Sequence, residues 1–162
     1  MNFTRSLWIG AWLVVLVVLH FTLRPMLAWR VQVDFLIVAL LLIAVNARPA
    51  IAAFIGFFLG VVTDSLSPAA FGAGALAMTL VGFASSWLKS VFFTENLALN
   101  AAFVFLGKWL FDVVYVFAEH RMGGIDLVAQ LLWWSPLSAI LTAVVGLGVL
   151  VVSRPPAVKV RR

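Results

Sequence analysis

Residues 97–118 read LALNAAFVFLGKWLFDVVYVFA, an almost entirely apolar run that contains two charged side chains. A helix needs roughly 20 mostly apolar residues to cross the hydrocarbon core of a bilayer. This stretch therefore predicts a membrane-spanning helix. Its charged residues, Lys108 and Asp112, lie four positions apart and share one face of that helix.

Lys108 falls near the middle of this span, where an isolated charge costs about 2.5–3.5 kcal/mol on insertion scales. An opposite charge one turn away lowers that cost. Two interpretations stay open: an internal ion pair that neutralises itself and orders the bundle, which we favour, or a proton or substrate site. We favour the ion pair because we expect no further carboxylate or histidine deep in the spans to continue a relay.

The rest of the chain has the same character. Of its 162 residues, 65% are hydrophobic and 10% are charged, against about 25% charged residues in soluble domains. The mean hydropathy is +1.16. A soluble fold of this size could not bury so much apolar surface. We expect an all-α bundle of six transmembrane helices in one membrane domain, residues 1–152, and a basic cytoplasmic tail, residues 153–162. The expected spans cover residues 7–23, 33–45, 50–63, 71–88, 97–118 and 127–152.

The distribution of basic residues predicts the orientation, because cytoplasmic loops carry an excess of Lys and Arg. Six spans would place seven basic residues on one side: Arg5, Arg48, Lys89, Arg154, Lys159, Arg161 and Arg162. Three would lie on the other: Arg24, Arg30 and Arg121. Both termini should therefore be cytoplasmic in a multi-pass protein of the membrane. We interpret the net charge of +5 through this rule and expect no nucleic-acid partner.

Residues 56–64, GFFLGVVTD, place Gly56, Gly60 and Asp64 on one helix face. Two glycines four apart form a flat strip that lets a neighbouring helix approach closely. The strip could serve packing within the chain or contact with a partner, and it leads to a carboxylate at the outer end of the span. Plain helix packing is the more common meaning of this pattern.

The acidic residues Asp34, Asp64 and Asp112 should all fall in the outer half of the bundle. We advance the hypothesis that they converge on one outward-facing polar pocket, neutralised by Arg24 or Arg30. Pro136 should kink the last span, because proline lacks the N–H that continues a helix.

The sequence carries no catalytic signature that we recognise. It has no cysteine, which removes thiolate chemistry. His20, near the end of the first span, and His120, in a loop, lack the spacing of a zinc motif. Hydroxyls such as those of Ser85-Ser86 and Ser135 should bond backbone groups or support a kink. We expect no catalytic, metal or cofactor-binding residue, and no enzyme.

Several of these residues resemble a known family. Gly56-x-x-x-Gly60-x-x-x-Asp64, followed by FGAGALAM at residues 71–78, resembles the signature region of MreD, the rod shape-determining membrane protein. This second motif adds Gly72 and Gly74 to the expected helix-packing or partner face. Asp112 followed by Phe117-Ala118-Glu119 at the end of span five is similar too. The layout of short loops and a basic tail fits along nearly the whole chain, whereas Lys108 has no place in the family pattern.

The resemblance implies a role that the residues alone do not. MreD proteins belong to the elongation machinery of rod-shaped bacteria and have no established catalytic activity. They associate with MreC, a single-span protein, and through it with the MreB filament, beside RodA and a class B penicillin-binding protein. Their fold is similar to that of the substrate-binding subunits of energy-coupling-factor transporters.

Three hypotheses follow. The preferred one is a non-catalytic component that binds an MreC-like partner and helps position lateral peptidoglycan synthesis in the bacterial cytoplasmic membrane. The alternative is a subunit that binds a vitamin or a lipid-linked precursor, lined by the outer acids. The third, an intramembrane enzyme, has only Lys108 and Asp112 as candidate groups.

Overall fold

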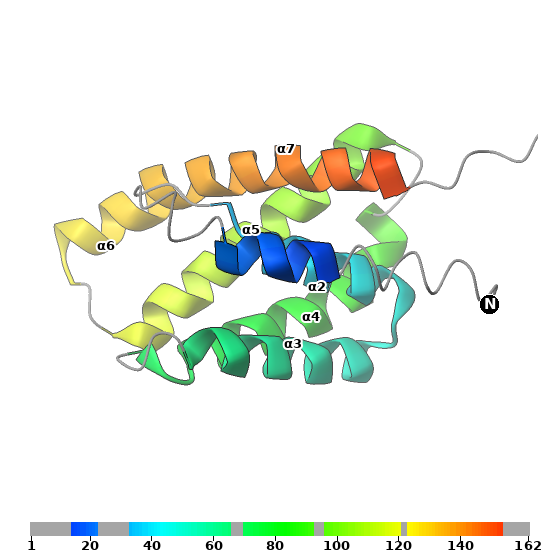
Figure 1. Ribbon diagram of the computed structural model, residues 1–162. Coiled ribbons are helices and arrows are strands. Elements are labelled where there is room, and N and C mark those ends of the chain that lie inside the picture. The colour runs from blue at the N-terminus through cyan, green and yellow to red at the C-terminus, as the bar shows by residue number, and fades with distance from the viewer. Residues whose placement is uncertain (1–13, 23–32, 66–69, 93–95, 121–122, 154–162) are drawn as a thin grey trace, which may run out of the picture.

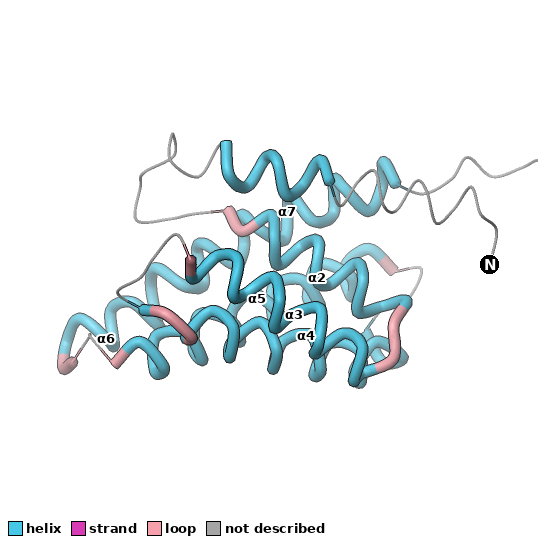
Figure 2. Tube along the Cα trace, turned by 60° about the horizontal axis from the view of Figure 1, so that its bottom comes forward, coloured by secondary structure: helices cyan, strands magenta, loops and turns pink. Residues whose placement is uncertain are grey.

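The computed structural model describes residues 14–22, 33–65, 70–92, 96–120 and 123–153. Every regular element in these ranges is a helix, as Figure 2 shows. The predicted all-α class is therefore confirmed for the described residues. The basic tail and the segments around Arg24, Arg30 and Arg121 lie outside these ranges.

The helices form six rods in the described residues. The first covers residues 14–22. The next four are α2 (Phe35–Asn46), α3 (Pro49–Asp64), α4 (Ala73–Phe92) and α5 (Leu97–Glu119). The sixth is a continuous rod made of α6 (Ile125–Ala129), the π-helix η2 (Gln130–Trp134) and α7 (Ser135–Ser153). The rods fall on the six stretches that the sequence marked as apolar.

Successive rods alternate in direction. In Figure 1 the helix of residues 14–22 runs away from the end marked N, α2 returns, and each later rod reverses again. The start of the helix of residues 14–22 and the end of α7 consequently lie toward the same end of the bundle. This is the arrangement expected when short loops connect antiparallel neighbours.

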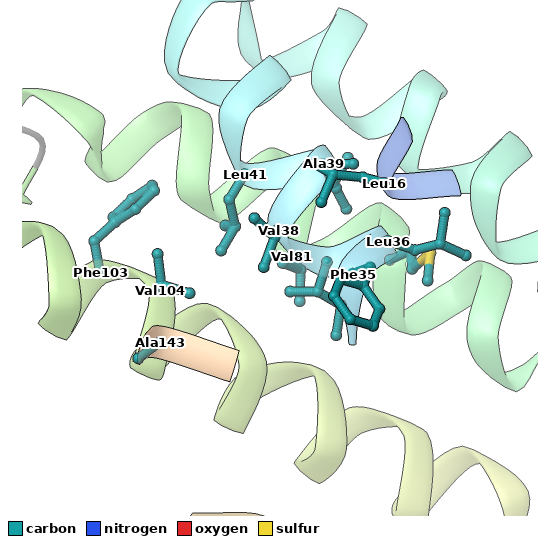
Figure 3. Close-up of a cluster of buried hydrophobic side chains, with 13 residues drawn as sticks. Leu16, Phe35, Leu36, Val38, Ala39, Leu41, Val81, Phe103, Val104 and Ala143 are labelled. Atoms are coloured by element: carbon teal, nitrogen blue, oxygen red, sulfur yellow. The ribbon is translucent and has the colours of Figure 1, made fainter. Parts of the chain in front are cut away.

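α2 forms the centre of the bundle. Its first seven residues, Phe35 to Leu41, are all buried. Figure 3 shows Leu16 from the helix of residues 14–22 beside α2, and Phe103, Val104 and Ala143 bringing α5 and α7 to the same cluster. A helix that is apolar on all sides must be covered on all sides, and α2 contacts α3, α4, α5 and α7.

Helix length differs among the rods. α5, with 23 residues, and the sixth rod over Ile125–Val151, with 27 residues, are long and apolar enough to cross a membrane. α2 has 12 residues and α3 has 16, which corresponds to about 18 Å and 24 Å at 1.5 Å per residue.

The helix ends follow local chemistry. Pro49 occupies the first turn of α3, where its missing N–H costs nothing. The Asn96 side chain accepts a hydrogen bond from the Ala98 N–H and caps α5. The wide turn of η2 ends at Trp134, two residues before Pro136, so the helix departs from regular α geometry next to the proline.

α4 differs from expectation. The sequence predicted that this span ends at residue 88, but the helix continues to Phe92. The Lys89 ammonium donates to the Ala47 carbonyl at 2.7 Å, and the Ser86 hydroxyl donates to the same oxygen at 2.8 Å. Lys89 is therefore a helical residue of α4 whose side chain hydrogen-bonds the turn between α2 and α3. The Ser86 bond confirms the predicted backbone-bonding role of that hydroxyl.

Candidate functional site

A buried charge cluster lies halfway along α5. Lys108 is the twelfth of the 23 residues of Leu97–Glu119, and it is only 3% exposed. Its ammonium contacts Asp112 one turn further along α5 and lies 2.5 Å from the Asp34 carboxylate. We call Lys108, Asp34, Asp112 and the adjacent His20 the Lys108 cluster.

The pairing of Lys108 with Asp112 agrees with the sequence interpretation of an ion pair on one helix face. The predicted convergence of Asp34 with Asp112 is confirmed, because both carboxylates contact the Lys108 ammonium. The sequence did not predict the contact between Asp34, which was assigned to the outer end of a span, and a lysine at the middle of α5.

Asp34 reaches this position because α2 begins inside the bundle. Residues 33 and 34 are not helical, and Asp34 is the N-cap residue of α2. The backbone N–H of Asp34 donates to the Thr142 hydroxyl of α7 at 3.3 Å. Its side chain makes no capping bond to α2, and its carboxylate is directed to Lys108. Non-helical backbone is tolerated in a buried position only when its polar groups have partners, and Thr142 supplies one.

His20 is the residue that the sequence analysis missed. We expected no further histidine deep in the bundle, and this expectation was wrong. His20 is 1% exposed, and its Nδ1 lies 4.0 Å from Oδ1 of Asp34. The assignment failed because position 20 was interpreted as the end of a span. Its four-residue spacing from the buried Leu16 was the available signal, since such a pair shares one helix face.

α7 and the ring of Phe111 also border the cluster. The Ser135 hydroxyl is fully buried near the Asp112 carboxylate, but its oxygen makes no hydrogen bond with the described residues. The Lys108 ammonium lies 5.1 Å from the centroid of the Phe111 ring, within the range of cation–π attraction. Burial of paired charges is costly unless their geometry is good, and here one ammonium contacts two carboxylates directly.

Asp64 is held in a separate place. It is 2% exposed and accepts hydrogen bonds from the backbone N–H groups of Gly72, Gly74 and Ala75 at 2.9, 3.1 and 2.9 Å. These donors stand at the start of α4, where helical N–H groups lack partners and the dipole favours an anion.

The hypothesis of one pocket shared by three acids is therefore wrong for Asp64. Backbone N–H groups compensate its charge locally, whereas Asp34 and Asp112 share Lys108. The proposed neutralisation by Arg24 or Arg30 concerns residues outside the described ranges. Glu119, also predicted as an outer-face charge, is half-buried and is the last residue of α5, two turns beyond Asp112.

The glycine strip packs α3 against α4. A Cβ on Gly56 would lie 2.3 Å from the Met78 carbonyl oxygen, and one on Gly60 would lie 2.3 Å from the Ala75 Cα. Gly82 of α4 approaches the Ala52 carbonyl in the same way. The face formed by Gly56 and Gly60 is thus used within the chain, as the helix-packing interpretation predicted.

Gly72 and Gly74 have different roles. Gly72 has a φ of +97°, a conformation that glycine adopts without steric cost, and it turns the chain into α4. A Cβ on Gly74 would lie 2.3 Å from Oδ1 of Asp64. Both glycines therefore allow the backbone to wrap around the Asp64 carboxylate.

Chemically, the Lys108 cluster can hold and exchange protons, because it combines two carboxylates, an ammonium and an imidazole away from solvent. Among the described residues, no group of three His, Cys, Asp or Glu side chains is arranged to hold a metal ion. No protein-family model, curated protein or solved structure matches the chain.

Proposed function

We propose that this chain is a multi-pass protein of the bacterial cytoplasmic membrane, in which all six rods cross the bilayer and both termini are cytoplasmic. The observation that carries the proposal is the inverted distribution of side chains. Charged and polar groups such as Lys108, Asp64 and Asn100 are buried. Large apolar side chains, including Phe54, Trp87 and Val144, are more than 60% exposed.

This arrangement suits a hydrocarbon solvent. Apolar surface facing lipid needs no cover, while intramembrane charges face the bundle interior and pair with one another. The short α2 also fits, since non-helical backbone at membrane depth is tolerated where protein buries it. The excess of basic residues in the loops on one side indicates that this side is cytoplasmic.

Within that membrane, the proposed role is a non-catalytic component of the cell-elongation machinery. It would bind an MreC-like single-span protein and help position lateral peptidoglycan synthesis, with MreB, RodA and a class B penicillin-binding protein as indirect partners. The support for this role is the resemblance of residues 56–78 and 112–119 to MreD. The outward helix faces offer the recognition surface, because the described residues are almost entirely helical.

The test is co-expression with an MreC-like protein, followed by purification through a tag on that partner. We expect the chain to co-purify in detergent and again after transfer to lipid discs. A six-helix membrane protein of unrelated origin, expressed at the same level, serves as the control. Failure to associate in either environment contradicts the role.

The alternative, a small-molecule-binding subunit, would require a ligand to displace existing contacts. Asp34 and Asp112 already contact Lys108, and Asp64 already accepts three backbone hydrogen bonds. A thermal-shift screen with vitamins and polyprenyl-linked precursors decides between the two. Stabilisation by one such compound favours the alternative, and a flat response favours the interaction role.

A further inference from the structure

The pair formed by α3 and α4, which we call the short side, is too short for an ordinary bilayer. α3 has 16 residues between Arg48 and Ser65, and 16 residues of α4 lie between Gly72 and Lys89. Each stretch is about 24 Å long at 1.5 Å per residue. The hydrocarbon core of a bilayer is about 30 Å thick, which leaves this pair about 6 Å short.

Polar contacts fix both ends of the short side. At one end the Lys89 ammonium and the Ser86 hydroxyl donate to the Ala47 carbonyl. At the other end the Asp64 carboxylate accepts three hydrogen bonds from backbone N–H groups at the start of α4. Because both ends are tied, α3 cannot slide along α4 to present a longer apolar surface.

Each of these helices exposes a row of large apolar side chains between its polar ends. The rows follow the three- and four-residue spacing of one helix face. They consist of Ile51, Phe54, Phe58 and Val62 on α3, and of Leu76, Leu80, Phe83 and Trp87 on α4. Because these side chains are exposed, in a bilayer they face lipid or another protein.

The composition of the rows favours lipid over another protein. Membrane helices pack together through small residues that let their backbones approach. The small residues Gly56, Gly60 and Gly82 already pack α3 and α4 against each other. The outward rows contain only large side chains, so they offer a second helix no close approach.

The opposite side of the bundle is longer. α3 packs against α4 and α2, whereas α7 packs against α5 and α2, and Figure 1 shows α3 and α7 along opposite edges. α5 has 23 residues and the sixth rod has 27 over Ile125–Val151, about 35 and 40 Å at 1.5 Å per residue. The same bundle therefore presents two different apolar lengths to its surroundings.

A bilayer adapts to a short helix by thinning, unless flanking side chains reach toward the interface or another protein covers the helix. Tilting offers no remedy, because it shortens the projected length further. The Lys89 ammonium cannot reach outward, because it is bonded to the Ala47 carbonyl. Lipids with short acyl chains reduce the cost of thinning, since their own hydrocarbon layer is thinner.

We propose that the short side thins the adjacent bilayer and collects phospholipids with short acyl chains, while the sixth rod faces lipids of the bulk composition. The inference rests on the proposed insertion of the chain in a bilayer. It does not depend on the proposed role in cell elongation.

The experiment compares two exposed positions near the middle of their rods. Phe58 of α3 is 52% exposed, and Ile140 of α7 is 51% exposed. The chain has no cysteine, so Phe58→Cys and Ile140→Cys each accept a single fluorophore. Each labelled full-length chain is reconstituted into vesicles that contain equal amounts of dimyristoleoyl and dierucoyl phosphatidylcholine. One of the two lipids is brominated, so that it quenches a fluorophore that it contacts.

With the short-chain lipid brominated, we expect quenching at position 58 to be several-fold stronger than at position 140. With the long-chain lipid brominated instead, the order should reverse, which controls for differences in the depth of the label. Val62→Cys probes the same row and replaces Phe58→Cys if that variant does not fold.

Three results overturn the proposal, and they have different meanings. An equal ratio of short-chain to long-chain quenching at both positions shows that both sides meet the same lipids. Weak quenching by either lipid at position 58, with strong quenching at position 140, shows that a second copy or another protein covers the short side. Weak quenching at both positions contradicts insertion in the bilayer, so the proposed function fails together with this inference.

Discussion

Among the described residues, carboxylates are held inside the bundle at two sites, and their charges are compensated in opposite ways. Asp64 accepts three hydrogen bonds from backbone N–H groups that lie 8 to 11 positions further along the chain. Asp34 and Asp112 instead share the Lys108 ammonium, and Asp34 is 74 positions away from it, as the residue numbers show. The first site is local, and the second joins distant helices.

The two sites differ in whether a substitution can remove the groups that compensate the carboxylates. At the Asp64 site the donors belong to the backbone and are present whatever the side chains are. At the Lys108 cluster the ion pairs depend on side-chain identity, and the pair with Asp34 depends also on the packing of separate rods. The cluster can therefore be rebalanced by a second substitution, whereas the Asp64 site cannot.

The largest expected effect comes from Lys108→Met. It leaves two carboxylates buried without their cation, and breaking a buried ion pair typically costs about 3–5 kcal/mol. The free energy of unfolding in a defined detergent mixture should fall by that amount. Lys89→Met is the control, because Lys89 is half-exposed and bonds only a carbonyl oxygen among the contacts described above.

Rebalancing sharpens this prediction. Adding Asp112→Asn to Lys108→Met removes one of the stranded charges and should recover a substantial part of the lost stability. A double variant as unstable as the sum of the two single variants would show that the charges do not interact.

Asp64→Ala should have the next largest effect, about 1.5–3 kcal/mol, the range of hydrogen bonds to a charged group. It leaves the donors at the start of α4 without their acceptor. Thermal unfolding of the purified variant measures the loss. Asn at this position should retain part of the stability because its oxygen still accepts, and equal losses for Ala and Asn would contradict the capping role.

The smallest of these effects is expected from Gly60→Ala. The new Cβ would lie 2.3 Å from the Ala75 Cα, a backbone atom that cannot rotate away, so α3 and α4 must separate. Overpacking of this kind costs about 1–3 kcal/mol. Gly148→Ala meets open space and should be neutral, so equal destabilisation by the two changes would argue against close α3–α4 packing.

Most of the correct predictions about the fold came from local sequence patterns. Apolar runs marked the six rods, Pro49 marked the start of α3, and the spacing of Gly56 and Gly60 marked the packing face. Lys108 and Asp112 were paired from their four-residue spacing. Each of these features depends on residues close together in the sequence, where helix geometry alone fixes the neighbours.

The errors arose where distant segments meet. A single sequence does not show that α2 begins inside the bundle, so the contact of Asp34 with Lys108 was not predicted and His20 was assigned to the end of a span. Asp64 was grouped with the other acids because its real partners are backbone N–H groups, which have no signature in residue type. The resemblance to MreD offered no help with Lys108, which lies outside that pattern.

The central claim is that these rods cross a lipid bilayer with the charges inside. The chain has no cysteine, so a single spin label can be attached at Leu106, which is 41% exposed and lies two positions before Lys108. In lipid discs, collisions with oxygen and with a water-soluble nickel complex report the surroundings of the label. We predict strong collisions with oxygen and exclusion of nickel at Leu106, and the reverse for a label at the exposed loop residue Gly123. Access of the nickel complex to both positions at equal rates would contradict the account.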